Sequence, residues 1–322
     1  MPRPRSLLLL AALAAVLSAP AAGAQGGENK GDRKGNDAHR FGVIGHSFAK
    51  PGDARFKAAL AETSEKSLAF VVVTGIKAAS EPCGDKLYQE RRDLLDKAKR
   101  PVVLVPAGSD WTECRNSAGR TNAVERLNRL RELFHGELNT AGSKKLELTR
   151  LSASPRFRSY AENAHWSVDS VLYATVNLPA NNNHYLAAAG RNSEYEDRLV
   201  ATRFWLNRLF TLARRDKVDA IVLFSEGDMK PLQLEPTGLR GLLRRAPVAQ
   251  DGFAAVRKQV QALAQRFKGK VLLVDSEALP KKAKPDIEWR DNVGHVSVGN
   301  EAVEIDVTPG EKALFSVKDA AE

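Results

Sequence analysis

The segment that most constrains the fold of this chain is the apolar, largely β-branched run at residues 68–74. It reads Leu-Ala-Phe-Val-Val-Val-Thr, which is typical of a strand buried on both faces. Similar short runs recur, and stretches with helical periodicity separate most of them. The expected strands are 41–44, 68–74, 102–105, 171–178, 220–224 and 271–274, and the expected helices lie near 54–62, 85–99, 123–134 and 253–267 and after residue 193. Alternating strands and helices predict an α/β fold built on a parallel sheet.

The last thirty residues have a different pattern. Apolar and polar residues alternate over 293–298 and again over 302–307. This two-residue period predicts antiparallel strands, which we assign to a second sheet. In the helix after residue 193, Ser193 and Glu196 have the spacing of a capping box.

The first 24 residues have the composition of a secretory signal peptide. Arg3 and Arg5 precede the apolar run 7–17, and Ala22 and Ala24 flank a glycine as in a cleavage site. The run is shorter than the roughly 20 apolar residues that a spanning helix needs. We therefore expect an exported protein, secreted or periplasmic, with no transmembrane segment. Residues 25–40 are polar and predict a disordered leader, and 41–322 predict a single domain.

The charge balance argues against nucleic-acid binding. The chain has 49 Lys and Arg against 39 Asp and Glu, a formal net charge of +10. The excess is spread along the sequence, and clusters occur only near residues 240–245 and 281–284. Nucleic-acid binders usually concentrate basic residues in one stripe with aromatic residues between them. The excess instead predicts a solvated basic surface that attracts anionic ligands, such as envelope polymers.

Cys83 and Cys114 are the two cysteines of the chain. Export would place both in an oxidising compartment, where an even number of cysteines favours a disulfide. A thiolate metal site would need more Cys or His residues nearby. We predict one disulfide bond.

Ligands of open α/β sheets bind beyond the carboxyl ends of the strands. Small and polar residues gather at these positions, as they do in any set of surface loops. The candidate cleft residues at these positions are Lys77, Asp110, Asn181, Asn182, Glu226 and Asp228.

The order and spacing of several motifs resemble a known family. The chain reads Thr-Gly-Ile-Lys at 74–77, Ser-Glu-Pro-Cys at 80–83 and Ala-Gly-Ser-Asp-Trp-Thr-Glu-Cys at 107–114. This frame resembles a bacterial exported branch of the calcineurin-like metallophosphoesterases, which reads Gly-Asp-Ile-Lys, Ser-x-Pro-Cys and Gly-Asp-Asn-Glu-Trp-Thr-Asp-Cys. The resemblance implies a four-layer α/β/β/α sandwich and metal-dependent phosphoester hydrolysis.

In that family two metal ions about 4 Å apart polarise the phosphate and activate a water. The resemblance places the first metal-binding Asp of the family on His46 and the metal-bridging Asp on Gly75. The Gly-Asp-Asn-Glu segment falls on residues 107–110, where Gly108 and Ser109 replace two of its polar side chains.

The remaining family positions lie later in the chain. A family His falls on Asn177, and the terminal Gly-Asp-x-His keeps Asp275 but has Glu277 in place of the His. A bridging carboxylate usually offsets the repulsion between two close cations, and no Asp occurs between residues 68 and 82. The sequence therefore predicts a pseudoenzyme without the dinuclear metal site, which needs no cofactor.

The sequence leaves two interpretations open: the pseudoenzyme described above and a hydrolase with a rearranged metal site. His46, Asp110, Glu226, Asp228, Asp275 and Glu277 together offer enough nitrogen and oxygen ligands for one divalent metal ion, as in a hydrolase with a rearranged site. Taken singly, Glu226 and Asp228 are expected to be solvated loop acids, and Lys77 either holds an anion or lies at the surface. We expect His165 to pack beside Trp166, and His184 and His295 to lie at the surface.

Overall fold

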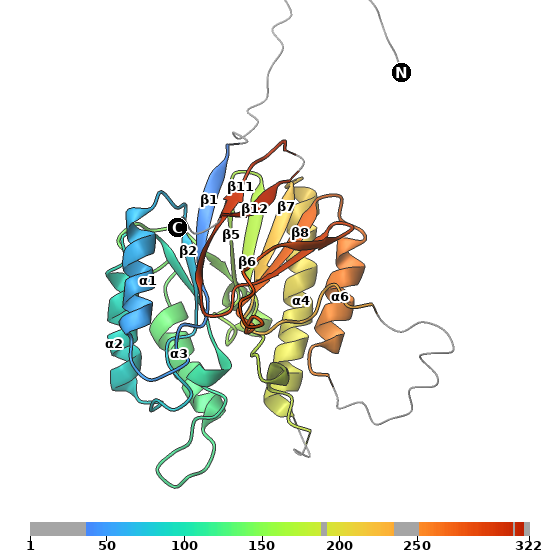
Figure 1. Cartoon of the computed structure of the whole chain (residues 1–322). Coiled ribbons are helices and arrows are strands. Elements are labelled where there is room, and N and C mark those ends of the chain that lie inside the picture. The colour runs from blue at the N-terminus through green and yellow to red at the C-terminus, as the bar shows by residue number, and fades with distance from the viewer. Residues whose placement is uncertain (1–36, 188–191, 235–250, 312, 319–322) are drawn as a thin grey trace, which may run out of the picture. The chain divides into compact units, whose positions relative to one another are not determined.

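Two mixed β-sheets form the centre of the α/β fold (Figure 1). The computed structural model describes residues 37–187, 192–234, 251–311 and 313–318. The predicted signal peptide, most of the predicted leader and the basic cluster near 240–245 lie outside these residues. All described residues belong to one unit, Lys34–Glu322. Among them, no helix is long and apolar enough to cross a membrane.

The first sheet has five strands. Three parallel strands lie at its centre and one edge, and two antiparallel strands from the end of the chain complete it. Their order is β12 (Phe315–Lys318), β11 (Ala302–Val307), β1 (His39–Ile44), β2 (Val71–Thr74) and β3 (Val102–Val105).

The second sheet has seven strands. Its central four strands are parallel, and the strands toward its two edges are antiparallel. Their order is β4 (Thr149–Arg150), β5 (Ala164–Val168), β6 (Val171–Thr175), β7 (Ala220–Phe224), β8 (Lys270–Asp275), β10 (Val293–Ser297) and β9 (Glu288–Arg290).

Helices cover the outer face of each sheet (Figure 1). Alternate residues of β2, such as Val71 and Val73, pack in one core with α1 (Ala54–Glu65), α2 (Asp85–Asp96) and α3 (Ala123–His135). On the other sheet, Leu223 and Leu273 pack against α4 (Ser193–Arg215) and α6 (Ala254–Ala264).

A third core lies between the two sheets. Phe70 and Val72 of the five-stranded sheet share it with Tyr173 and Phe224 of the seven-stranded sheet. The Phe70 and Tyr173 rings have centroids 4.8 Å apart in an edge-to-face arrangement, a geometry that aromatic pairs favour. Because successive strand residues point to opposite faces, each buried strand contributes to both an inner and an outer core.

Three predictions about the elements are wrong. The alternating segments near the end of the chain do not both form antiparallel strands of one second sheet: β10 joins β8 in parallel in the seven-stranded sheet, whereas β11 is antiparallel to β1 and β12 in the five-stranded sheet. The predicted leader ends too late, since His39 and Arg40 already pair with β11. The strand predicted over 171–178 ends at Thr175, ahead of Pro179, whose nitrogen cannot donate to a sheet.

The predicted capping box is also wrong. Asn192 is the N-cap of α4 and makes no side-chain cap bond. Its amide instead exchanges two hydrogen bonds with the backbone of Leu186. Ser193 is the first helical residue, so its hydroxyl and Glu196 do not have the positions that a capping box needs.

Candidate functional site

The carboxyl ends of β1, β2 and β3 bring three of the family-mapped positions together. His46 follows β1, and its Nε2 lies 2.9 Å from the hydroxyl oxygen of Ser109, which follows β3. The Ser109 hydroxyl also donates to the carbonyl of Lys77. The loops after all three strands are therefore joined by side-chain hydrogen bonds, and His46 and Ser109 satisfy each other.

Gly75 lies directly beneath this pair. Its φ of +70° is a left-handed conformation, which glycine adopts without a steric penalty. A Cβ at this position would lie 2.5 Å from Cδ2 of His46 and 2.8 Å from Cβ of Ala107. Real Cβ atoms do not approach other carbons this closely, so the space that a bridging carboxylate would need is filled.

Lys77 is neither at the surface nor open to a ligand, contrary to both interpretations of its sequence position. It is 0% exposed, and its ammonium donates to the carbonyls of Ala78 and Ser109, at 2.7 Å each. Burial lowers the pKa of Lys77. Its role here is to hold two backbone segments together.

Asp110 is a buried clamp and not a cleft acid. One carboxylate oxygen accepts hydrogen bonds from the amides of Ile76 and Lys77, and the other accepts from the amide of Ala107. Burial raises the pKa of Asp110, and the amide donors and the charges of His46 and Lys77 oppose that effect. Both oxygens are thus engaged with the backbone, which leaves Asp110 unsuited to binding a ligand.

Glu226 is buried, so the prediction of a solvated loop acid is wrong for it. Its Oε2 accepts from the amide of Gly108, 2.6 Å away, and from the amide of Ala180, 2.8 Å away. Burial raises the pKa of Glu226 to about 8. Because Gly108 follows β3 and Ala180 lies beyond β6, Glu226 connects loops of the two sheets.

The asparagines of the mid-chain segment also make internal bonds. Asn177 donates to Oε1 of Glu162, 3.0 Å away, and this carboxylate also pairs with Arg131. Asn181 donates to the hydroxyl of Thr112, and Oδ1 of Asn182 accepts from a backbone amide. Asn181 lies close to Gly108, whereas Asn177 bonds to residues away from the His46 cluster.

The strand β8 ends beside β2. Ser276 donates to the hydroxyl of Thr74, with the two oxygens 2.8 Å apart, so the backbone at Asp275 and Gly75 lies at the same edge of the two sheets. The side chain of Asp275 does not join the His46 cluster, however. It accepts from the hydroxyl of Ser297 and the amide of Glu277.

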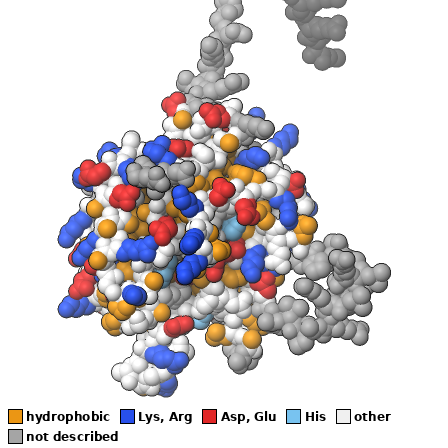
Figure 2. All heavy atoms as spheres, viewed as in Figure 1, with side chains coloured by type: hydrophobic (Ala, Val, Ile, Leu, Met, Phe, Trp, Pro, Cys, Tyr) orange, Lys and Arg blue, Asp and Glu red, His pale blue; other side chains and the backbone are white. Residues whose placement is uncertain are grey.

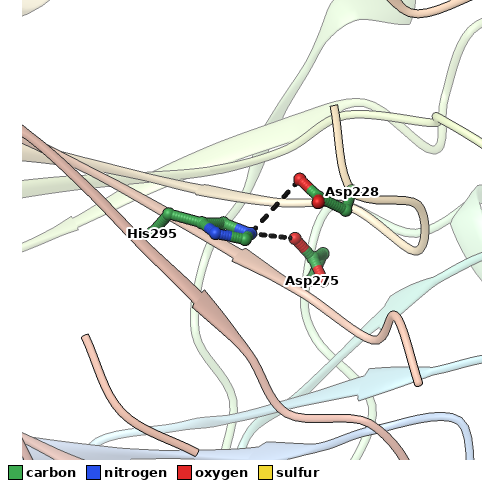
Figure 3. A group of neighbouring side chains, drawn as sticks. All are labelled: Asp228, Asp275 and His295. Carbon is green, nitrogen blue, oxygen red and sulfur yellow. Dashed lines mark hydrogen bonds and ion pairs between the residues drawn. The ribbon is translucent and has the colours of Figure 1, made fainter. Parts of the chain in front are cut away.

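Asp275 instead meets His295 and Asp228 (Figure 3). His295 Nε2 lies 2.6 Å from Asp275 Oδ2 and 3.3 Å from Asp228 Oδ1. Burial lowers the pKa of His295, but the hydrogen bond to Asp275 and the two carboxylate charges outweigh it and raise the pKa above the ordinary value. Burial, with the charge of Asp275, raises the pKa of Asp228.

The sequence interpretation missed His295 as a site residue. It placed His295 at the surface, yet the side chain is 16% exposed. No local sequence signal marks it, because only the pairing of β10 with β8, which places His295 opposite Leu273, brings it near Asp275. Asp228 was a candidate, although the prediction that it is a solvated acid is wrong.

Of two other histidines, His184 differs from its predicted surroundings, whereas His165 packs against a tryptophan as predicted, although not against Trp166. The His184 ring packs edge-on against Trp111, with the centroids 4.8 Å apart, so it is not a free surface residue. His165 packs on Trp205, with the ring centroids 5.5 Å apart. Neighbours in a strand point to opposite faces, which is why His165 does not contact the adjacent Trp166 ring.

The predicted disulfide is confirmed. Cys83 and Cys114 are bonded, with their Cα atoms 5.9 Å apart. The bond joins the loop after β2 to the loop after β3, and the Tyr88 hydroxyl donates to the carbonyl of Asp110 in the same region. It therefore fixes the backbone that carries Gly75 and Ser109.

A pocket of about 440 Å³ opens beside His46 and Ser276. Its outer wall is the loop 278–283, which includes Lys281 and Lys282. Over the face drawn in Figure 2, Lys and Arg side chains are interspersed with Asp and Glu. The positive charge of Lys281 and Lys282 is thus confined to the pocket and does not continue into a larger basic patch on the described part of that face.

A scan against models of known protein families found no match for this chain, and a search of curated proteins found none either.

Proposed function

We propose that this chain is an exported, non-catalytic protein with the four-layer α/β/β/α fold of the metallophosphoesterases, and that it binds an anionic ligand. The succession of outer helices, two packed sheets and outer helices supports the fold assignment. The Cys83–Cys114 disulfide supports export, because such bonds persist in oxidising compartments. The shared strand edge at Gly75, Ser109 and Ser276 supports the family mapping.

The observation that carries the non-catalytic interpretation is the packing at Gly75. A dinuclear phosphoesterase needs a carboxylate between its metals to offset their repulsion. At Gly75 even a methyl group would overlap His46 and Ala107. A bridging Asp at this position would require the His46 ring and Ala107 to shift.

The other family positions do not fit two metals either. Ser109 and His46 bond to each other, Asn177 is directed at Glu162, and Asp275 is directed at His295. The donors that a dinuclear centre would need are replaced or engaged elsewhere in the fold. We therefore derive no hydrolytic step for this arrangement.

The pocket beside His46 is where we place the ligand. Lys281 and Lys282 are exposed at its rim, and the chain has an overall positive charge. Glu301 also lines the pocket but pairs with Arg55, which offsets its charge. This distribution favours an anion, such as a phosphate group of an envelope polymer.

Titration calorimetry with inorganic pyrophosphate at low salt tests the binding role. The double variant Lys281→Ala with Lys282→Ala should bind about five- to thirtyfold more weakly, since exposed ion pairs contribute about 0.5 to 1 kcal/mol each. The control removes two exposed lysines elsewhere, Lys144→Ala with Lys258→Ala. Equal weakening in both variants, or no binding by the parent, would refute the assignment of this pocket.

The competing function is a hydrolase with a rearranged metal site. The cluster of Asp228, Asp275 and His295 favours it, because three potential metal ligands meet there. Metal-dependent turnover that is lost in Asp275→Ala would support this alternative over the non-catalytic interpretation.

A further inference from the structure

We propose that Asp228, Asp275 and His295 form a binding site for a single divalent cation, with Zn²⁺ or Mn²⁺ as the fitting ions. One ligand atom from each residue lies within 4.8 Å of the other two. Ligand atoms around a tetrahedral zinc ion are about 3.3 Å apart, given metal–ligand distances near 2 Å. The separations of 2.6 and 3.3 Å at His295 Nε2 therefore need only small side-chain shifts to admit an ion.

This site is separate from the family-mapped cluster around His46. Leu273 and Val293 point into the core on the helix side of the seven-stranded sheet. Asp275 and His295 lie two residues further along the same strands, so they face the same side. The cluster around His46 and Gly75 lies instead at the carboxyl ends of strands of the five-stranded sheet. The proposed site thus shares Asp275 with the family-mapped positions, whereas its other two ligands, Asp228 and His295, are not among them.

The surroundings hold the ligands in place. The Ser297 hydroxyl donates to Oδ1 of Asp275 at 2.8 Å, and the Glu277 amide donates to the same oxygen at 3.0 Å. These bonds leave Oδ2 directed at His295. The amide of Lys230 donates to Asp228. Hydrogen bonds of this kind, which orient a ligand from behind, are typical of protein metal sites.

The local charge also favours a cation. The carboxyl groups of Asp228 and Asp275 lie near that of Glu277: besides burial, the charge of Asp275 raises the pKa of Asp228, and the charges of Asp275 and Asp228 raise the pKa of Glu277. The positive groups that act on these acids are His295 and Lys230. A divalent ion bound by the two aspartates would offset the repulsion among the three carboxylates.

The donor set indicates which ions fit. One imidazole nitrogen and two carboxylate oxygens suit Zn²⁺ and Mn²⁺, whereas copper(I) prefers sulfur ligands. Asp228 and His295 have side chains that are 17% and 16% exposed. An ion can therefore enter from solvent and keep a water on its open side.

The test is Mn²⁺ and Zn²⁺ titration of the chain prepared without a polyhistidine tag. The parent should bind one ion, and Asp228→Asn and His295→Gln should each weaken binding at least about tenfold. Asn keeps the oxygen that accepts from Lys230, and both replaced side chains are partly exposed, so both variants should fold. The control Asp93→Asn removes an exposed acid on α2 and should bind as the parent does.

Electron spin echo spectra of bound Mn²⁺ give a second readout. The parent should show coupling to an imidazole nitrogen, and His295→Gln should lose it. The proposal is overturned if the parent binds no ion at millimolar concentration, if both variants bind as tightly as the parent, or if the nitrogen coupling survives in His295→Gln. None of these results depends on whether the protein hydrolyses phosphoesters.

Discussion

At Gly75 the backbone conformation favours a glycine, and the lack of space opposes any side chain. The φ of +70° disfavours any side chain, and His46 and Ala107 fill the position of a Cβ. The two causes can be separated, because Gly119 has a φ of +73° with nothing within 4 Å of its Cβ position. Gly119 is therefore a matched reference for backbone strain alone.

We expect Gly119→Ala to destabilise the protein by about 1 to 2 kcal/mol through backbone strain. Gly75→Ala should lower the free energy of unfolding by about 1 to 3 kcal/mol more than Gly119→Ala does, which is the range for overpacking. Adding His46→Ala to Gly75→Ala should recover part of that loss, since it removes the closest contact. Urea unfolding of the parent, the single variants Gly119→Ala, Gly75→Ala and His46→Ala, and the double variant measures these differences.

Equal losses for Gly75→Ala and Gly119→Ala would contradict the packing account. So would strict additivity of the His46 and Gly75 substitutions, because residues in contact should show a coupling energy. Either result would indicate that position 75 has room for a larger side chain.

At the scale of elements, Glu226 connects the two sheets through their loops. It accepts from the amide of Gly108 beyond β3 and from the amide of Ala180 beyond β6. Its ordinary pKa is 4.5, and burial raises it to about 8. Between these pH values the unfolded chain releases the proton while the folded chain keeps it. The free energy of unfolding therefore falls as the pH rises from about 4.5 to 8.

Glu226→Gln should remove this dependence, because Gln stays neutral and still offers an oxygen to both amides. Relative to the parent, the variant should gain stability as the pH rises from 5 to 8. The gain should exceed about 1.4 kcal/mol by pH 8, the free energy of a tenfold change in a protonation equilibrium. Thermal and urea unfolding across this range measure it, with the exposed Glu90→Gln as control. A constant difference between Glu226→Gln and the parent at all pH values would show that Glu226 does not titrate as described.

The local sequence pattern predicted most of the elements, because buried strands and amphipathic helices differ in composition and period over a few residues. It placed β3 and β7 to the residue and β8 to within one residue at each end, whereas β2 begins three residues later than predicted. It could not assign β10 and β11 to their sheets, since that choice depends on pairing with β8 and β1, far away in sequence. His295 was missed for the same reason, as its proximity to Asp275 exists only in the paired register.

At the scale of the whole molecule, two of the candidate cleft residues, Asp110 and Lys77, hold the backbone together. Asp110 binds three backbone amides, and Lys77 binds two carbonyls. The sequence predicted the missing ligands but not these bonds, because burial of a polar side chain depends on all the elements around it.

The most direct test of this account measures hydrolysis of p-nitrophenyl phosphate and bis-p-nitrophenyl phosphate with Mn²⁺, Zn²⁺ or Mg²⁺, together with the number of ions bound. We expect no rate above that of the metal alone, and no more than one bound ion per chain. Two bound ions with turnover, abolished by Asp275→Ala or Glu277→Ala in protein that still folds, would contradict the non-catalytic interpretation.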